Sequence, residues 1–174
     1  KLDREFIQQK SPWLAVKMHY KYHMSDRLVE LHNFDGGYAG ISKVENGHVN
    51  LCYLASYDSF KKHKNVTDFN EKVLSKNEFL NSFFKEAIPV WEQPITISQI
   101  SFEKKEPVES NILMLGDTAG LIHPLCGNGM AMAIHSAKIA FEELHPFLKN
   151  DLSREQALKN YANKWKKTFR KRLK

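Results

Sequence analysis

Hydrophobic and polar positions in the first third of the chain alternate with the period of two that is typical of β-strands. Between these segments, Asp35-Gly36-Gly37 and Glu45-Asn46-Gly47 are turn sequences that tolerate positive φ. Short strands joined by such turns predict an antiparallel meander. Its strands are expected at residues 13–20, 28–33, 38–44 and 48–55.

From residue 67 to residue 87 the apolar positions recur every three or four residues, which is the helical period. We expect two short helices here, broken near Ser75 and Lys76. Another strand is expected at residues 96–102. A short, buried, apolar strand is expected at residues 111–115.

The last third of the chain predicts a glycine-rich loop at residues 116–129, followed by a helix at residues 130–144 that Pro146 helps to end. Ser153 and Gln156 have the spacing of a capping box, which predicts the start of a final helix. That helix has an apolar stripe at three- and four-residue spacing: Leu158, Tyr161, Trp165, Phe169 and Leu173.

These elements predict an α+β fold: a mostly antiparallel sheet domain with a helical insert at residues 1–110, a strand–loop–helix at 111–150 and a basic amphipathic helix at 151–174. With 42% hydrophobic and 26% charged residues, the chain has an ordinary globular composition. Two cysteines indicate a reducing compartment, and we expect a cytoplasmic protein. No apolar run approaches the roughly 18 residues of a membrane span, so we expect no stable membrane insertion. The chain begins with Lys1, and we expect a fragment of a longer protein.

The net charge of +6 is concentrated at one end of the chain. Seven basic residues in the last eleven positions exceed the whole net charge, so the remainder is close to neutral. We interpret this end as the solvated face of an amphipathic helix. The alternative is a basic interaction module for nucleic acid or an acidic partner. The sheet segment lacks a matching stripe of arginines and aromatics, so we expect no nucleic-acid binding.

The glycine-rich stretch contains the most informative chemistry. The apolar strand before it delivers Gly116 and Asp117 at its carboxyl end, where open α/β sheets place ligands. Glycines let the backbone approach a ligand, and the exposed N-terminus of the next helix favours an electron-rich or anionic group. Gly127-x-Gly129 is not a dinucleotide fingerprint, because eleven residues separate the strand from Gly127 and no second strand follows the helix.

The whole stretch resembles the second flavin-binding motif of the FAD-dependent monooxygenase and geranylgeranyl-reductase-like superfamily, which has the aromatic-hydroxylase fold. Residues 34–54 are similar to a strand pair in the substrate-side sheet of the same proteins. The matching positions of the motif are Gly116, Asp117, Thr118, Ala119, Gly120, Pro124, Gly127, Gly129, Ala133 and Ala137.

The resemblance implies that the segment binds FAD, with NAD(P)H as the reductant. Asp117, next to Gly116, would accept a hydrogen bond from a ribityl hydroxyl. Pro124 and the turn at residues 127–129 would lie beside the isoalloxazine ring. The implied cofactor-binding set is Gly116, Asp117, Pro124, Gly127, Asn128 and Gly129.

Members of this superfamily begin with a strand–helix dinucleotide unit bearing G-x-G-x-x-G, and this sequence has none. The resemblance therefore implies the C-terminal, substrate-side part of a longer flavoprotein. That part would need the N-terminal dinucleotide-binding unit as its partner and would be inactive alone.

The implied activity is that of a monooxygenase-type oxidoreductase acting on an apolar or aromatic small molecule. A geranylgeranyl-reductase-like or halogenase-like reaction is the alternative, since all three share the flavin loop. Tyr38, Tyr53 and Trp91 are candidates to line the substrate pocket, although aromatics in a meander are often core residues.

Several other residues have two interpretations, and no catalytic residue can be named. Asp117 could cap a loop instead of contacting a cofactor. Cys126 could be a redox group, but we favour a small residue in a tight turn. His123 could donate a proton near the flavin or face solvent. We expect Cys52 in the core and His135 at the surface or packed. No set of residues has metal-ligand spacing, so we expect no metal.

Overall fold

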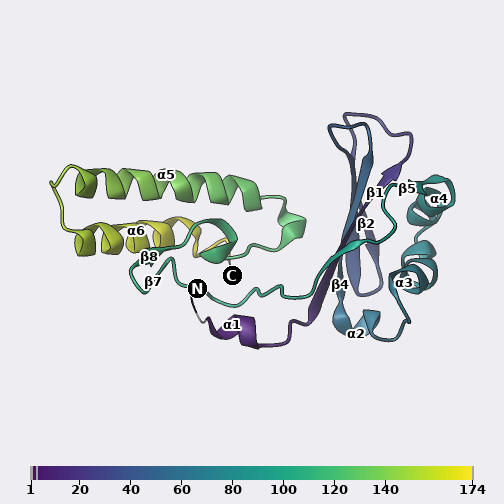
Figure 1. Ribbon diagram of the computed structural model, residues 1–174, viewed down its shortest axis with the longest axis horizontal. Coiled ribbons are helices and arrows are strands. Elements are labelled where there is room, and N and C mark those ends of the chain that lie inside the picture. The colour runs from purple at the N-terminus through teal and green to yellow at the C-terminus, as the bar shows by residue number, and fades with distance from the viewer. Residues whose placement is uncertain (1, 3, 174) are drawn as a thin grey trace. The chain divides into compact units, whose positions relative to one another are not determined.

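The chain divides into two compact units, Lys1–Ile100 and Ser101–Lys174. The computed structural model describes residue 2 and residues 4–173 (Figure 1). Each unit has its own buried residues and is described by itself. The two segments predicted at 111–150 and 151–174 belong to the same unit.

The first unit is built on an antiparallel sheet whose four long strands match the four predicted segments to within about one residue at each end. The edge is completed by two short strands, β5 (Ile88–Pro89) and β6 (Ile95–Ile97), which both pair with β1. The long strands are β1 (Trp13–Lys21), β2 (Val29–Phe34), β3 (Gly37–Lys43) and β4 (Val49–Ser56).

The sheet is not a simple meander, because its order is β2-β3-β4-β1-β5. β2, β3 and β4 follow one another as predicted, but β1 pairs antiparallel with β4, with Trp13 opposite Ser56. The reason lies in the inward-facing side chains. β1 and β4 bury large apolar residues such as Val16 and Leu51, whereas β2 turns Glu30 and His32 inward. Central positions suit the two apolar strands, and the edge suits β2.

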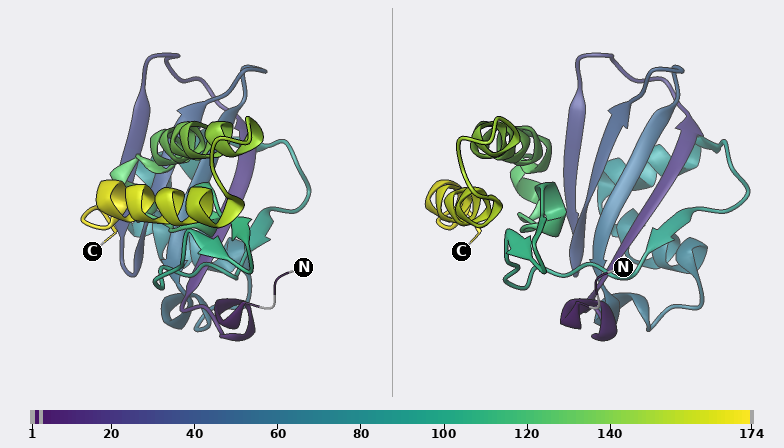
Figure 2. Two further views of the ribbon diagram at one scale, coloured as in Figure 1. Left: turned by 90° about the vertical axis from the view of Figure 1, so that its left-hand side faces the viewer. Right: turned by 60° about the vertical axis from the view of Figure 1, so that its left-hand side comes forward.

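A helical layer covers one face of this sheet (Figures 1 and 2). The predicted helical region is broken as expected, because the Asn77 side chain caps α4 by accepting from the backbone N–H of Phe79 and Leu80. The helices of this unit are α1 (Glu5–Gln8), α2 (Tyr57–Phe60), α3 (Val66–Lys72), the 3-10 turn η1 (Leu74–Lys76) and α4 (Glu78–Glu86).

Phe69 on α3 is the centre of the packing between the helical layer and the sheet. Its side chain is fully buried. Ring centroids lie 6.0 Å away for Phe34, 6.0 Å for Tyr53 and 5.3 Å for Phe60. One aromatic ring therefore joins β2, β4 and α2 to the helix.

The strand predicted at residues 96–102 is wrong in length. β6 covers only Ile95–Ile97, opposite residues 15–17 of β1. The chain then leaves the sheet, where the Ser11 hydroxyl donates to the Ile100 carbonyl at 2.6 Å. Ser98 and Gln99, which follow β6, are exposed, and no strand pairing is recorded for them among the described residues.

The second unit begins with a small hairpin of β7 (Val108–Glu109) and β8 (Ile112–Leu113). Ser110 and Asn111 form its turn with φ of 49° and 61°, so Asn111 is a turn residue and not the start of a strand. The prediction of a buried strand at 111–115 is also wrong. Ile112 is 50% exposed and Leu115 40% exposed, because β8 has a single, two-residue partner, and only Met114 is buried.

Two long helices, α5 (Gly129–Leu148) and α6 (Arg154–Phe169), run side by side in opposite directions (Figure 1). The prediction that Pro146 ends the first helix is wrong, since α5 continues to Leu148. Pro146 cannot donate to the Glu142 carbonyl and its ring crowds that carbonyl, so the helix continues only two residues further, to Leu148. The helix then closes with the Lys149 N–H on the His145 carbonyl.

The start of α6 forms half of the predicted capping box. Ser153 Oγ accepts from the Gln156 N–H at 3.2 Å, but the Gln156 side chain donates forward to Asn160 instead of back to Ser153. The apolar stripe is confirmed as the buried side of the helix, with Leu173 half-buried beyond its end. The buried members are Leu158, Tyr161, Trp165 and Phe169.

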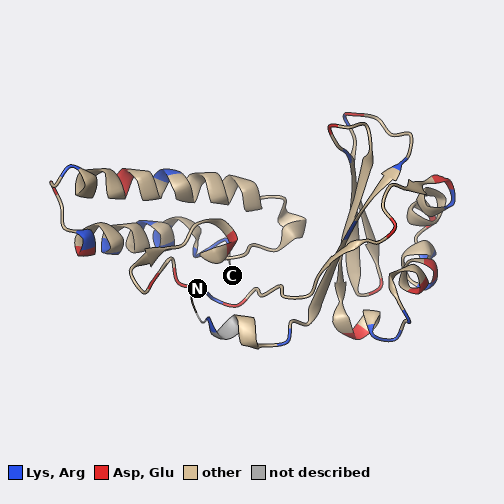
Figure 3. Cartoon of the chain, viewed as in Figure 1, with Lys and Arg blue, Asp and Glu red and all other residues tan. Residues whose placement is uncertain are grey.

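The opposite side of α6 is basic, as expected (Figure 3). Several of these charges are paired within the unit. Lys164 Nζ lies 2.7 Å from Glu142 and 3.1 Å from Glu143, both on α5, and Lys166 Nζ lies 2.6 Å from Glu106. The positive face is thus partly neutralised by neighbouring carboxylates.

We expect Phe69→Ala to lower the free energy of unfolding of the first unit by about 3–5 kcal/mol, because it removes a fully buried ring and leaves a cavity. Phe79→Ala on α4 is the matched control. Phe79 is 70% exposed, so its loss is expected to cost less than about 1 kcal/mol. Urea denaturation followed by circular dichroism measures both. Equal losses in the two variants would contradict the central role of Phe69.

We expect Tyr161→Phe to lower the stability of the second unit by about 1–3 kcal/mol, because the Tyr161 hydroxyl donates to the Met114 carbonyl at 2.6 Å. Burial raises the pKa of Tyr161 from 10.0 to about 12. The folded state therefore favours the neutral phenol. Its contribution is complete below pH 10 and is lost as the pH rises toward 12.

Denaturation at about pH 7 and about pH 11 tests this dependence. Tyr161→Phe should show a smaller alkaline loss than the unaltered protein. The control Tyr57→Phe, at a half-exposed position, should lose as much stability at high pH as the unaltered protein does.

Candidate functional site

The glycine-rich loop starts where β8 meets α5. Gly116 adopts the left-handed conformation, with φ of 56°, and opens the 3-10 turn η2 (Gly116–Thr118). Its N–H donates to the Ser136 hydroxyl at 3.2 Å, and that hydroxyl donates to the Ala133 carbonyl at 2.8 Å. A Cβ at Gly116 would lie 3.2 Å from the Ala133 side chain. A glycine and a small helix residue thus bring the strand end against α5.

Asp117 follows at this junction and is exposed. Among the described residues, the structure records no hydrogen-bond partner for its carboxylate, whereas its backbone carbonyl accepts from Lys105 Nζ at 3.0 Å. The N-cap position of η2 is Leu115, so Asp117 does not cap this turn. The carboxylate is left available as a hydrogen-bond acceptor.

The far end of the loop presents the start of α5. A 3-10 turn, η3 (Pro124–Cys126), is closed by Gly127 in the left-handed conformation, with φ of 61°. Asn128 is the N-cap residue of α5, and its side chain makes no capping hydrogen bond. The first backbone N–H groups of a twenty-residue helix are therefore uncapped, at the positive end of its dipole.

These segments enclose a hollow of about 510 Å³. Four of the six predicted cofactor residues line it: Asp117, Pro124, Gly127 and Gly129. Gly116 and Asn128 do not line it. Cβ atoms at Gly127 or Gly129 would meet nothing within 4 Å, so open space lies above both.

The loop rests on α6. Ala119 is fully buried, and a Cβ at Gly120 would lie 2.6 Å from the Leu173 side chain and 3.0 Å from the ring of Trp165. The absence of a side chain at Gly120 lets the backbone lie on the indole. Together with the Tyr161 hydroxyl on the Met114 carbonyl, this contact holds the loop from behind.

The cysteines and histidines singled out in the sequence lie apart from one another. Cys126 is exposed in η3. Cys52 is exposed as well, which makes the core assignment wrong, because it points to the face of β4 opposite Leu51 and Tyr53. His123 is exposed, its Nδ1 accepts from the Leu125 N–H at 3.4 Å, and its ring stacks on Phe102. His135 is exposed and packs edge-on against Phe169, as expected.

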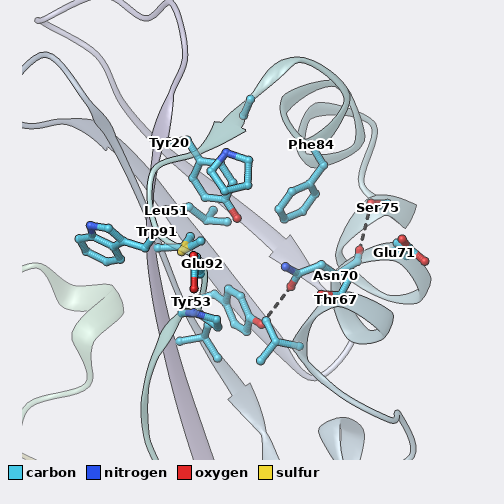
Figure 4. Close-up of a pocket in the computed structure, with 16 residues that line it drawn as sticks. Tyr20, Leu51, Tyr53, Thr67, Asn70, Glu71, Ser75, Phe84, Trp91 and Glu92 are labelled. Atoms are coloured by element: carbon cyan, nitrogen blue, oxygen red, sulfur yellow. Dashed lines mark hydrogen bonds between the residues drawn. The ribbon is translucent and has the colours of Figure 1, made fainter.

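The first unit contains a separate cavity of about 330 Å³ between the sheet and the helical layer (Figure 4). Tyr53 and Trp91 line it, but Tyr38 does not, so the three predicted pocket residues do not come together. Tyr53 donates its hydroxyl hydrogen bond to Asn70 Oδ1 at 2.9 Å. Sequence reasoning missed Asn70; the available signal was a polar residue four positions after Val66, on the inward face of α3.

The opposite face of the sheet contains a polar pair that sequence reasoning also missed. His19 on β1 lies directly across from Asn50 on β4. His19 Nε2 and Asn50 Oδ1 are buried without a hydrogen-bond partner among the described residues. The His19 ring stacks on Trp91 at 4.4 Å. Burial lowers the pKa of His19, with Lys17 and His48 adding to the effect, so the imidazole favours its neutral form.

No helix among the described residues is both long and apolar enough to cross a membrane. No group of three or more His, Cys, Asp or Glu side chains in that part of the chain is arranged to hold a metal ion.

Comparison with known proteins places these features in context. The squalene epoxidase family model matches residues 73–174, more than half of the chain. A digeranylgeranylglycerophospholipid reductase of Methanocaldococcus jannaschii is 33% identical over 133 residues, which cover 75% of this chain and 32% of the reductase. The corresponding reductase of Methanococcus vannielii is 28% identical over 63% of this chain and 28% of its own length. The chain thus spans about a third of these curated relatives.

Solved structures agree on the fold. A myxobacterial chondrochloren halogenase, described as FAD-dependent, matches 91% of this chain and 38% of its own with a TM-score of 0.71 at 11% identity. A probable FAD-dependent monooxygenase from Pseudomonas aeruginosa matches 95% of this chain and 47% of its own with a TM-score of 0.64 at 17% identity.

A geranylgeranyl bacteriochlorophyll reductase-like protein from Thermoplasma acidophilum matches 92% of this chain and 40% of its own, with a TM-score of 0.63 at 20% identity. At such identities the structural matches show the fold alone. The family model and the sequence relatives go further and confirm the resemblance drawn from the glycine-rich motif. The chain therefore belongs to the squalene epoxidase family, within the superfamily of FAD-dependent oxidoreductases.

Proposed function

We propose that the protein containing this chain is an FAD-dependent oxidoreductase and that the loop between β8 and α5 holds the flavin. One observation supports this most directly: the hollow gathers three features. They are an exposed carboxylate with no hydrogen-bond partner among the described residues, two glycines beneath open space and an uncapped helix N-terminus. These features suit a ligand that offers hydroxyl donors, a flat face and an electron-rich edge.

The residues fit the parts of the cofactor as follows. The Asp117 carboxylate would accept a hydrogen bond from a ribityl hydroxyl. Gly127 and Gly129 would let the backbone approach the ring, with Pro124 beside it. When bound, the flavin supplies redox chemistry that protein side chains lack. The uncapped end of α5 would favour negative charge on that ligand and so stabilise its reduced state.

For the reaction we propose monooxygenation of an apolar or aromatic small molecule, with NAD(P)H as the reductant. The squalene epoxidase family match supports this choice. Reduction is the second candidate, because two sequence relatives, 28% and 33% identical, are named as reductases. A halogenase-like reaction is supported less, since the halogenases match in fold alone.

A basic module that binds nucleic acid or an acidic partner is the weaker proposal. Lys164 and Lys166 on α6 already pair with carboxylates of the same unit, which lowers the charge left for a partner. We propose a protein that functions in the cytoplasm together with its own dinucleotide-binding part, and without nucleic acid.

Asp117→Ala is expected to weaken flavin binding by the whole protein at least about tenfold, because hydrogen bonds to charged groups contribute about 1.5–3 kcal/mol. The visible flavin absorbance relative to the protein absorbance measures this. Asp151→Ala, which removes another exposed aspartate outside the loop, is the control and should keep its flavin. Undiminished flavin in Asp117→Ala would remove Asp117 from the site.

Gly129→Ala separates ligand binding from stability. Alanine at this helical position is expected to raise stability by as much as about 1 kcal/mol, since nothing in the protein obstructs its Cβ. The same methyl group would project into the space assigned to the flavin and weaken its binding. Thermal unfolding of the cofactor-free protein and flavin titration give the two readouts. Unchanged flavin affinity would show that the ring does not approach Gly129.

A further inference from the structure

The cavity between the sheet and the helical layer has an apolar body and a defined polar lining (Figure 4). Val16, Leu51 and Phe84 contribute apolar walls. A volume of about 330 Å³ lies in the range of pockets that hold small ligands. All of its lining residues belong to the first unit, so the cavity is complete within that unit.

Two hydrogen-bond donors reach this cavity without a partner among the described residues. Asn70 uses Oδ1 to accept from the Tyr53 hydroxyl, which leaves its amide Nδ2 directed into the cavity (Figure 4). The Tyr20 hydroxyl reaches the same space, on a side chain that is 6% exposed. Burial raises the pKa of Tyr20 to about 12, so the phenol stays protonated and can donate.

The charged residues around the cavity are all acidic. The charged residues lining it are Glu71 and Glu92, and no lysine, arginine or histidine is among the lining residues that the structure describes. The Glu71 carboxylate points away from the cavity in Figure 4. A bound carboxylate or phosphate would therefore lose its hydration without gaining a cation, which is costly in an apolar site.

We propose that this cavity binds a neutral, mostly apolar molecule through one oxygen acceptor held by Asn70 Nδ2 and the Tyr20 hydroxyl, and that it excludes anionic ligands. A carbonyl oxygen fits best, because its two lone pairs can accept from both donors. The inference deepens the substrate part of the proposed function, and its connection to redox chemistry rests on that function. It predicts a neutral substrate group here, in contrast to the charged headgroup of a phospholipid.

The test compares two probes of equal size with the full chain: 2-acetylnaphthalene, which is a neutral ketone, and 2-naphthoate, which is its anionic counterpart. Isothermal titration calorimetry measures their affinities. The ketone is expected to bind at least about tenfold more tightly than the carboxylate. Equal affinities, or tighter binding of the carboxylate, would overturn the proposal without any substitution in the protein.

Two variants with matched controls locate the binding. Tyr20→Phe is expected to weaken ketone binding about fivefold through the loss of one hydrogen bond, whereas Tyr22→Phe, outside the lining, should bind like the unaltered protein. Ala87→Leu should block the cavity, whereas Ser82→Leu adds the same side chain at an exposed position of α4. Unchanged ketone binding in Tyr20→Phe or in Ala87→Leu would place the ketone elsewhere.

Flavin absorbance in the same variants of the whole protein keeps the two proposals apart. Flavin retained without selective ketone binding would overturn the cavity proposal alone. Selective ketone binding in a protein that takes up no flavin would support the cavity and overturn the flavoenzyme proposal.

Discussion

The glycine-rich loop depends on the helix behind it. α6 buries one side against the rest of the second unit. From that side the Tyr161 hydroxyl donates to the Met114 carbonyl, and Trp165 lies under Gly120. These contacts fix the backbone just before and just after Asp117. An open loop of glycines would otherwise lose considerable conformational entropy on binding a ligand. The charge of α6 suggests only a solvated surface element, but its buried side holds the loop backbone in one conformation.

At the start of the loop, one serine hydroxyl connects two elements. Ser136 accepts from Gly116 and donates to Ala133, so the strand end and the first turns of α5 share a single buried group. The direction of the uncapped N–H groups is thus set by packing before any ligand arrives. Preorganised dipoles of this kind cost little reorganisation when charge appears near them.

Much of this organisation could be predicted from the sequence, where local physics decides it. The strands from Trp13 to Ser56 follow from alternation and from turns that need glycine, and the break before α4 follows from an asparagine cap. The resemblance of the glycine-rich motif singled out six residues, and four of them line one hollow in the structure. Where tertiary contacts decide the position or length of an element, the sequence alone did not predict it. The place of β1 beside β4 and the length of β6 depend on which partners are present in space.

The positions of individual side chains also depend on tertiary contacts that the sequence does not reveal. Cys52 lies in an apolar strand segment that predicts a core position, but its side chain is on the face opposite Tyr53 and is exposed. The register of strand pairing decides which face of the strand is covered. Tyr38 leaves the predicted pocket for the same reason. His19 and Asn50 are separated by thirty residues, and only the β1–β4 pairing brings them together.

The contact between Gly120 and Trp165 has a consequence for how this sequence can evolve. Any side chain at position 120 would collide with the indole ring and with Leu173 unless those residues became smaller. We therefore expect a substitution of Gly120 to require a change or a shift at Trp165, forty-five positions away, and at Leu173. Across homologous sequences, we expect substitutions at position 120 to occur together with substitutions at Trp165 or Leu173. A homologue with a larger residue at position 120 alone would need a different packing surface beneath the loop.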